Sequence, residues 1–440
     1  MSDSPPAPAS APHLPIPPLA VRRAVLFSLA SIGAGMVFTF FNAQLPLYLR
    51  DYGLPRQVIG PLTNERSLAG ALVLPIVGRL SDRARTRWGK RRPFFAAGVP
   101  LMAAALVLLG FRPPLPLMLL TVVAAGGFLF VALGPYQALM ADITPPEQRG
   151  QMGSFMALAG LGGAVLVTLL AALFWDQHSE LVFLAVAAVL LLTFALTFFS
   201  VREPAHHYSD GAGPTADTAG PEDSGAEEPA PVPRLGPRAY LRDVVRFRQT
   251  GRYIGAMSLY WLAAGGATPF ITLFGTETLH LRAREANLLF LVLVLSTAGG
   301  TVLVGLLADR LGKKRVLHAG LGVFAVAALA AAGVQDAWQA VAVMVLAGLG
   351  NACPTALGVP VLADLMPPRR GGEFIGLASS VWSVVQPLGS FLAGSLVDGF
   401  HSDRWAFAFA AFFMAVAAVA MFGVHPDRAV HDHAQDLVPA

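Results

Sequence analysis

Twelve apolar runs occupy most of this 440-residue chain, and each is long enough to cross a lipid bilayer as a helix of about 20 residues. Hydrophobic residues make up 55% of the chain and charged residues 13%, against roughly 25% charged in soluble domains. We therefore expect an all-α integral membrane protein. Its predicted spans lie at about 24–49, 57–81, 93–111, 116–141, 148–174, 180–201, 252–276, 285–308, 314–334, 338–363, 373–398 and 404–424.

The predicted spans form two groups of six, separated by a polar stretch at 202–248. The middle of this stretch, 209–233, holds six acidic residues and no Lys or Arg among Gly, Ala and Pro. Such a composition buries too little apolar surface to fold alone. We predict a disordered tail at 1–20, a six-helix bundle at 21–201, a disordered cytoplasmic linker at 202–248, a second bundle at 249–424 and a tail at 425–440.

The basic residues predict the orientation of the chain in the membrane. With both termini placed in the cytoplasm, 24 of the 31 Lys and Arg residues fall on the cytoplasmic side and six on the outer side, while Arg66 lies within a span. Cytoplasmic loops of membrane proteins carry such an excess of cations. A bias toward Arg, Ala, Gly and Pro favours a GC-rich bacterium, so we expect a bacterial inner membrane with both termini cytoplasmic.

Two sequence repeats indicate that the halves arose by duplication and are pseudo-symmetric. Gly78–Pro93 reads GRLSDRARTRWGKRRP, and Gly305–Arg315, 227 residues later, reads GLLADRLGKKR. Each contains a Gly, three residues, Asp-Arg, and a second Gly before a basic cluster. A second pair of repeats is LMADITPPEQRG at 139–150 and VLADLMPPRRGG at 361–372. Both pairs occupy the same places in their halves, as in transporters with parallel six-helix repeats.

At these residues the chain resembles the major facilitator superfamily, whose fold is two six-helix bundles. The resemblance implies that Asp82 and Asp309 face the first turns of helices eleven and five while the cytoplasmic side is closed. A carboxylate is favourable there because it meets exposed N–H groups and the positive end of the helix dipole. The alternative is a solvated loop acid paired with a nearby Arg. We assign a conformational gate to Gly78, Asp82, Arg83, Arg87, Asp142, Arg149, Gly305, Asp309, Arg310 and Asp364.

The loop between spans two and three is longer than its counterpart in the second half. Its sequence, SDRARTRWGKRRPF, is similar to the glycoside–pentoside–hexuronide symporters and sucrose-transporter-like proteins. That resemblance implies a sugar or glycoside as solute. Sodium-coupled members carry two aspartates in span two, and the matching positions here are Gly70 and Leu74. The departure favours proton coupling or facilitated diffusion over a sodium site.

Glu65 and Arg66 are ionisable residues inside predicted span two. They lie about nine residues from its outer end, hence ~13 Å deep at 1.5 Å per residue. Ionisable groups at that depth are costly and mark functional sites by default. We predict Glu65 as the proton-coupling site, with Arg66 beside it. The alternatives are a structural ion pair and a helix that starts deeper in the chain than the predicted span.

Polar and aromatic residues near the middle of several spans predict a solute site between the halves. Sugars are bound by aromatic faces together with amides and hydroxyls, and transporter sites lie near the bilayer midplane. For any single residue, interhelical hydrogen bonding or packing is the alternative. The predicted binding residues are Phe38, Asn42, Phe130, Tyr136, Tyr260, Trp261, Thr268, Ser296, Asn351, Trp382 and Gln386.

The motifs that would indicate other classes of protein are missing from the sequence. The single cysteine, Cys353, excludes an intramolecular disulfide, and we find no His/Cys metal motif, phosphate-binding loop or nucleophile motif. We expect no cofactor, metal, nucleic acid or enzymatic activity, and a monomer in contact with lipid. The leading hypothesis is sugar or glycoside symport with a proton by alternating access. The second is an efflux carrier for drugs or other small amphiphiles; a membrane receptor or enzyme would be a different class.

Overall fold

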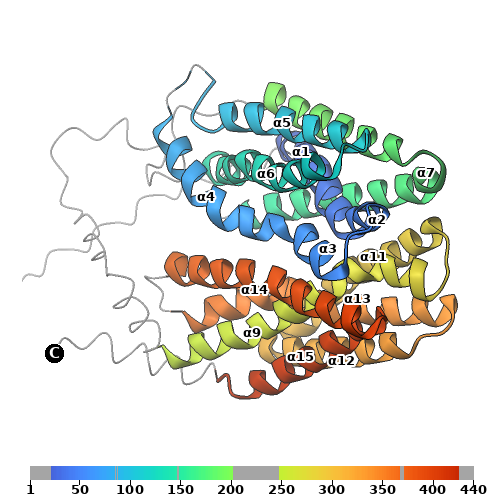
Figure 1. Ribbon diagram of the computed structural model, residues 1–440. Helices are drawn as coiled ribbons and strands as arrows, with labels where there is room; N and C mark the ends of the chain where they lie inside the picture. Colours follow the sequence, from blue (N-terminus) through green and yellow to red (C-terminus); the bar gives the residue numbers. More distant parts are fainter. Residues whose placement is uncertain are drawn as a thin grey trace, which may run out of the picture.

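The computed structural model describes residues 21–84, 86, 88–145, 148–201, 247–366 and 371–425, without the side chains at 65–68, 82 and 371–373. Nearly all of the predicted tails and linker therefore lies outside the described part, as do Arg87 and the side chains of Glu65, Arg66 and Asp82. The described residues form two helical bundles that lie side by side, coloured blue to green and yellow to red in Figure 1. We call residues 21–201 half one and residues 247–425 half two.

Half one contains six spans. Its helices are α1 (Val21–Ala43), α2 (Leu45–Asp51), α3 (Arg56–Thr63), α4 (Glu65–Arg83), α5 (Arg92–Gly110), α6 (Leu115–Ile143) and α7 (Arg149–Ser200). The 52-residue α7 is too long for one span, and the non-helical backbone at His178 (φ −143°, ψ 61°) divides it into two. Span one is α1 with α2, and span two is α3 with α4.

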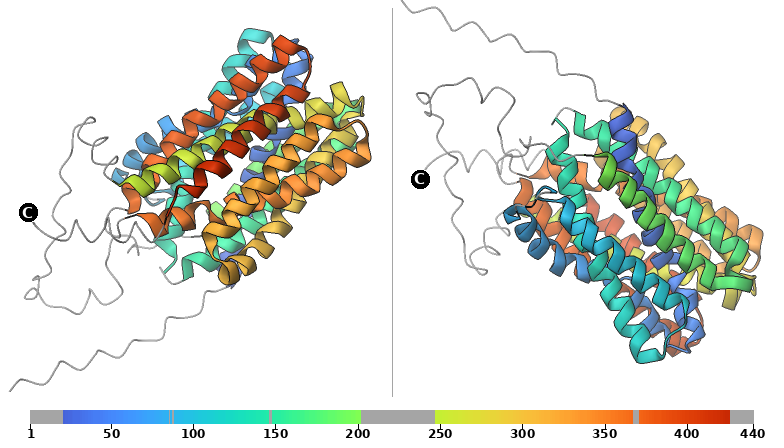
Figure 2. Two further views of the ribbon diagram at one scale, coloured as in Figure 1. Left: turned by 90° about the horizontal axis from the view of Figure 1, so that it is seen from below. Right: turned by 90° about the horizontal axis from the view of Figure 1, so that it is seen from above.

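Half two also contains six spans. Its helices are α9 (Arg248–Ala267), η3 (Thr268–Phe270), α10 (Ile271–Leu273), η4 (Phe274–Thr278), α11 (Ala283–Leu311), α12 (Lys313–Gly333), α13 (Ala337–Leu365), α14 (Gly371–Phe400) and α15 (Arg404–Phe422). The first four are consecutive segments of span seven. In both views of Figure 2 the long helices of the two halves run along the same direction of the molecule.

Ten of the described helices are long and apolar enough to cross a membrane by length and composition. They include α7, which holds two spans, and leave out span two, whose helix is interrupted between Thr63 and Glu65. The structure and the comparisons below confirm the predicted all-α fold of twelve spans in two bundles. A helix satisfies every backbone polar group within its own segment, which is why apolar runs of this length adopt it in lipid.

Three spans are broken at prolines. Span one changes direction at Gln44, where Pro46 enters the first turn of α2. Span two contains Pro61 in α3 and breaks at Asn64 (φ −103°, ψ 7°). In span seven, Pro269 stands in a 3-10 turn that is followed by a π-helical turn at 274–278. Because proline lacks an N–H donor, it loosens the helix at each of these places. Spans one and seven occupy equivalent positions in the two halves.

Two hydrophobic clusters form the core, one built chiefly from half one and the other chiefly from half two, and the first extends into half two through residues such as Phe270, Leu273 and Ala393. Within half one, α1 packs against α7, and α5 against α6 and α7. Within half two, α13 packs against α11 and α12, and α9 against α14 and α15. Between the halves, α3 and α4 contact α14, while α7 contacts α11.

The structure gives the two sequence repeats matching geometry. Gly89 and Gly312, which precede the basic clusters, both have positive φ angles, +105° and +89°. Arg91 Nε lies 3.1 Å from Asp142 Oδ2 in half one, and Lys313 Nζ lies 2.8 Å from Asp364 Oδ2 in half two. Each ion pair joins residues 51 positions apart. The repeats therefore form the same loop-to-helix contact in each half.

Candidate functional site

A cavity of about 1120 Å³ lies between the two halves. It is lined by α1, α4, α6 and α7 of half one and by α9, η3, α11, α13 and α14 of half two. Small-molecule sites typically occupy about 300–1,000 Å³, so the cavity can hold a small organic solute with water. Its lining reaches Ser154 and Gly376, five residues from the starts of α7 and α14.

The two walls of the cavity differ in chemistry. The described lining of half one is mostly apolar: Phe38, Gly70, Ala71, Leu74, Pro75, Phe130, Ala157, Leu158 and Leu161, with Asn42 and Ser154. The lining of half two carries many hydroxyl and amide groups: Tyr260, Thr268, Thr297, Thr301, Asn351, Thr355, Ser379, Ser380, Ser383 and Gln386. A solute in the cavity therefore meets hydrogen-bonding groups chiefly from half two.

An aromatic and amide cluster stands in the half-two wall. Tyr260 Oη donates a hydrogen bond to Asn351 Oδ1 at 2.7 Å. The Tyr260 ring meets that of Trp261 edge-on, with centroids 5.2 Å apart. Trp382 lies behind Trp261, with ring centroids 6.2 Å apart. The cluster gives the wall a large ring surface beside a fixed amide.

Eight of the eleven predicted binding residues line the cavity. They are Phe38, Asn42, Phe130, Tyr260, Trp261, Thr268, Asn351 and Gln386. Phe38 and Phe130 meet edge-to-face at 6.5 Å on the half-one side. Their contact with a solute remains a prediction.

The other three predicted binding residues do not line the cavity. Tyr136 is buried inside half one, where its hydroxyl donates to the carbonyl oxygen of Phe27 and lies 2.9 Å from Ser31 Oγ. Ser296 packs against Gly348 of α13. Trp382 supports Trp261 from behind and donates a 3.5 Å hydrogen bond to the carbonyl oxygen of Ile254. These side chains bind neighbouring helices, which was the alternative for each of them.

The sequence prediction missed several hydroxyl groups of the lining. Ser379, Ser383 and Gln386 follow one another at helical spacing along α14 and line the cavity together with Ser380. The prediction singled out only the Gln of this face, although the spacing of four and then three residues was visible in the sequence. Thr301 and Thr355 also line the cavity and were missed.

Buried amide groups join the halves at one end of the cavity. Gln44 Nε2 donates to Asn287 Oδ1 at 2.8 Å, and both side chains are fully buried. Asn64 Nδ2 donates to Ser390 Oγ at 2.6 Å. Gln44 and Asn64 are the residues at which spans one and two break. We call this end, which includes the loops at 51–56, 110–115, 278–283 and 400–404, the sealed end.

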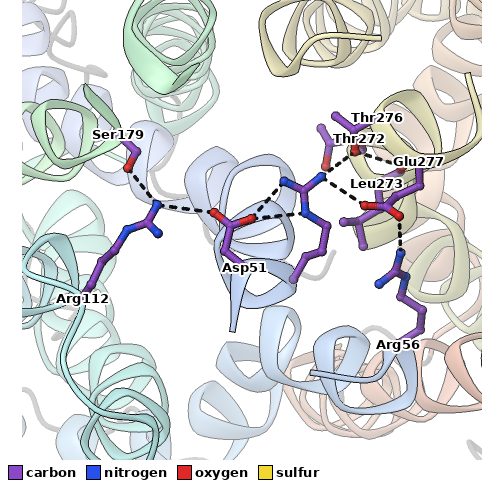
Figure 3. A network of polar contacts seen from close by, with 9 residues as sticks. Asp51, Arg56, Arg112, Ser179, Thr272, Leu273, Thr276 and Glu277 are labelled. Carbon is purple, nitrogen blue, oxygen red and sulfur yellow. Dashed lines mark hydrogen bonds and ion pairs between the residues drawn. The ribbon is translucent and has the colours of Figure 1, made fainter. Parts of the chain in front are cut away.

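Ion pairs at the sealed end also join the halves (Figure 3). Glu277 of half two accepts contacts from Arg50 Nη1 at 3.2 Å and Arg56 Nη2 at 3.5 Å. Arg56 Nε also lies 3.3 Å from Asp403 Oδ1. Asp51 stands between Arg50 and Arg112, so that a chain of alternating charges crosses the interface. Burial raises the pKa of Asp403 above the usual carboxyl range, and Arg56 opposes that effect.

Asp398 of α14 caps the first turn of α3 across the interface. Its Oδ1 and Oδ2 atoms accept hydrogen bonds from the backbone N–H groups of Arg56 and Gln57, at 3.0 and 2.9 Å. The helix backbones approach closely at two glycines. A Cβ added to Gly60 would stand 2.6 Å from the carbonyl oxygen of Ser390, and one added to Gly394 would stand 2.4 Å from that of Arg56. Sequence analysis did not identify this contact.

The predicted gate residues whose side chains are described lie at the opposite end, where the second turns of α7 and α14 border the cavity. Asp309 and Arg310 are exposed, and a Cβ added to Gly78 or Gly305 would meet no described atom within 4 Å. Arg149 donates to the carbonyl oxygens of Ala141 and Thr144, at the end of α6. We call this the open end. Arg83 is an exposed residue in the last turn of α4 at the same end.

The cavity lacks the features of a metal centre within the part that the structure describes. No group of three or more His, Cys, Asp or Glu side chains there could hold a metal ion. The described lining is made of neutral side chains.

Comparisons with known proteins agree with this architecture. The family model described as Major Facilitator Superfamily matches residues 27–282 and 253–439. The sucrose transport protein SUC4 of Arabidopsis thaliana is 28% identical over 180 residues, which are 35% of this chain and 35% of that protein. The human solute carrier family 45 member 4 is 29% identical over 239 residues, 48% of this chain and 30% of that protein. The matched regions span about a third of these curated relatives.

Solved structures share the fold over nearly the whole chain. A bacterial homologue of the human lysosomal transporter Spinster, in an inward-facing and occupied conformation, superposes with a TM-score of 0.69 and 16% identity. The match covers 96% of this chain and 98% of that one. Two six-helix bundles around a shared cavity define a membrane protein of the transporter type. The chain belongs to the Major Facilitator Superfamily.

Proposed function

We propose that the protein is a secondary transporter that carries a neutral sugar or glycoside across the membrane by alternating access, together with a proton. One observation carries the proposal: the cavity of about 1120 Å³ lies between two bundles that are joined by side-chain contacts at the sealed end. In such an arrangement a solute leaves through the open end, and rocking of the halves would expose it at the other.

The chemistry of the cavity supports a sugar as solute. Ring faces at Tyr260 and Trp261 stand beside amides at Asn351 and Gln386 and a row of hydroxyls on α14. Apolar surface combined with a few placed polar groups is typical of sites for small polar organic molecules. The similarity to SUC4, a sucrose transport protein, is consistent with this class.

The charge distribution predicts the orientation of the protein in the membrane. The orientation in turn predicts which side of the membrane each end of the cavity faces. Most Lys and Arg residues belong in the sequence to the tails, the linker and the loops that connect helix ends at the open end, so we infer that this end faces the cytoplasm and that both termini do so as well. The structure then corresponds to an inward-open state. We further infer that the protein works as a monomer in a bacterial inner membrane.

Proton coupling is proposed for Glu65, with Arg66 as its neighbour in span two. Glu65 follows directly after Asn64, whose side chain joins the halves at the sealed end. A carboxyl at this break would be exposed or covered as the halves move, which is what coupling requires. The Glu65→Gln protein should still exchange sugar across the membrane but should no longer accumulate it with a pH gradient. Unchanged accumulation by this variant would contradict the assignment.

A second candidate is efflux of small amphiphiles, and the apolar wall of half one favours it. Leu74, Leu158 and Leu161 line the cavity with the two phenylalanines of that wall. A solute with one apolar and one polar face would match both walls.

Uptake into proteoliposomes tests the proposal and its alternative together. The purified protein would be offered labelled sucrose and methyl glucoside, with and without an inward pH gradient. We expect saturable uptake of at least one sugar, increased by the gradient. No sugar uptake, with extrusion of a cationic dye, would favour the efflux carrier and contradict the sugar transporter.

A further inference from the structure

Six hydroxyl groups of the half-two wall each donate their proton to a hydrogen bond within the protein. Tyr260 donates to Asn351 Oδ1 at 2.7 Å. The others donate to the carbonyl oxygen four residues earlier in their own helix, at 2.7–2.9 Å: Thr268, Thr297, Thr301, Thr355 and Ser380. All six residues line the cavity.

This arrangement determines whether the six hydroxyls can donate or accept a hydrogen bond when they meet a solute. A hydroxyl has one proton and two acceptor lone pairs, so a committed proton leaves acceptor capacity. Turning the proton toward a solute would break the internal bond and leave a helix carbonyl with one contact fewer. The six hydroxyls therefore present lone pairs to a solute at no such cost. The wall also holds donors: the hydroxyls of Ser379 and Ser383, the amide N–H groups of Asn351 and the indole N–H of Trp261.

The positions of these groups extend the acceptor surface along the cavity. Thr301 lies one helical turn from Thr297 on α11, and Thr355 lies one turn from Asn351 on α13. Thr355 and Ser380 are exposed in the cavity. A solute would meet acceptors from three helices of half two at once. At these positions the wall favours a molecule that carries several hydroxyl protons over a carboxylate or phosphate, whose oxygens only accept.

We propose that these six hydroxyls select the solute by accepting hydrogen bonds from it, so that the ring hydroxyls that meet them are recognised through their protons. The inference rests on the proposed transport of a sugar. It identifies the hydroxyl protons of the sugar ring as the groups that the cavity recognises. Uncharged polyhydroxylated rings fit it. Uronic acids, sugar phosphates and sugars alkylated at ring hydroxyls other than the anomeric one do not.

Fluorine substitution separates the two roles of a sugar hydroxyl. Replacing the hydroxyl by fluorine keeps a small electronegative group and removes the proton, whereas replacing it by hydrogen removes both. Leaving a buried acceptor without its donor weakens recognition by about 5- to 100-fold. At each ring position that contacts the wall, the fluoro and deoxy analogues should therefore lose recognition equally.

The test measures competition with labelled sucrose for uptake into proteoliposomes. The competitors are methyl glucoside, its series with each ring hydroxyl replaced in turn by hydrogen or fluorine, and methyl glucuronide. We expect at least two positions at which both replacements weaken competition by more than about fivefold, and no competition by the glucuronide. Fluoro analogues that compete as well as methyl glucoside at the positions where deoxy analogues fail would overturn the inference alone. Absence of both sucrose uptake and methyl glucoside uptake would overturn the proposed function, and this inference with it.

A pair of variants tests whether a hydroxyl of the half-two wall accepts a hydrogen bond from a sugar hydroxyl. Thr355→Val removes a cavity hydroxyl with little change of shape. Thr121→Val is the matched control, because the Thr121 hydroxyl makes the same bond to a carbonyl four residues earlier, at 2.6 Å, but is buried outside the cavity lining. Thr355→Val should lower sucrose uptake and make one sugar position insensitive to fluorine, while Thr121→Val should keep the parent pattern. A Thr355→Val protein whose sensitivity to fluorine equals that of the parent at every position would contradict the inference.

Discussion

Asp398 of half two caps a helix of half one: its Oδ1 atom accepts a hydrogen bond from the backbone N–H of Arg56 at 3.0 Å. Its second oxygen accepts from the next N–H, that of Gln57, at 2.9 Å. A carboxylate at a helix N-terminus is favourable because it pairs with N–H groups that have no partner within the helix. The contact crosses the boundary between halves that must separate if the sealed end opens. It therefore favours the closed arrangement of that end.

Removal of this cap should shift the protein toward opening of the sealed end. Loss of a capping side chain costs about 0.5–2 kcal/mol, so Asp398→Ala should raise the ratio of open to sealed forms by about 2- to 30-fold. Spin labels at Leu115 and Trp338, which are exposed at the sealed end in different halves, report the separation. Asp336→Ala is the control, because Asp336 contacts Gln339 within half two. An unchanged distance distribution in Asp398→Ala would contradict this role.

The glycine contact in the same interface gives a second prediction. Gly394→Ala would place a methyl group 2.4 Å from the carbonyl oxygen of Arg56, and overpacking of this kind costs about 1–3 kcal/mol. The sealed end should open more often, which the same pair of spin labels would detect. Gly399→Ala in the same helix is the control, since a Cβ there would meet no described atom within 4 Å. Equal behaviour of the two variants would show that close packing does not hold the end shut.

The raised pKa of Asp403 predicts how a fall in pH changes the equilibrium between closed and open arrangements of the sealed end. Burial raises the pKa of its carboxyl, Arg56 lowers it by a smaller amount and Glu277 adds to the rise; Thr278 also contacts the carboxyl. When the end opens, the carboxyl meets water and its pKa returns toward about 4. The sealed form therefore binds the proton more tightly than the open form does. As the pH falls from the raised pKa to the ordinary carboxyl pKa, the equilibrium shifts toward the sealed form.

Asp403→Asn should remove the pH dependence that arises from this carboxyl. The variant carries a neutral side chain at every pH, as the protonated carboxyl does. The distance between the labels at Leu115 and Trp338, measured over a pH series, should change less in the variant than in the parent. If acid opens the parent protein, or if the variant follows the same pH curve, the prediction is wrong.

The repeated ion pairs predict unequal effects of equivalent mutations. The Asp142 side chain is 2% exposed and its partner Arg91 12%, whereas Asp364 and Lys313 are 48% and 45% exposed. Breaking a buried pair costs about 3–5 kcal/mol, because the remaining charge stays buried. An exposed pair contributes about 0–1 kcal/mol. Asp142→Asn should therefore lower the unfolding temperature in detergent clearly and Asp364→Asn slightly. A similar decrease in both variants would contradict this account.

The architecture could be predicted from the sequence because the span signal is strong. Runs of about 20 apolar residues and the repeated loops determine the number and grouping of spans. It was harder to predict whether a given side chain faces the cavity or the interior of its own half. Tyr136 and Tyr260 both stand in apolar spans, yet the first hydroxyl is enclosed in half one and the second borders the cavity. Helices that are apolar on all sides carry no amphipathic pattern to distinguish the two.

The contacts of the sealed end could not be predicted from the sequence for a different reason. Asp398 and Gly394 are ordinary residues near the end of a span, and Arg56 begins another span more than three hundred residues away. Their importance comes from the approach of two helices in different halves. No local pattern reports such a pairing, whereas the repeated Gly-x-x-x-Asp-Arg loops were visible because they occur twice.

The most direct test of the account is the sidedness of a cysteine placed in the cavity. Cys353→Ser removes the only native thiol, and Ser380→Cys introduces one at an exposed position of the lining. A membrane-impermeant thiol reagent would be applied from either side, with and without Asp398→Ala. We expect labelling from the cytoplasmic side in the parent and a gain of labelling from the outer side in the Asp398→Ala protein. Labelling that is restricted to the outer side in the parent, or unaffected by Asp398→Ala, would contradict alternating access through this cavity.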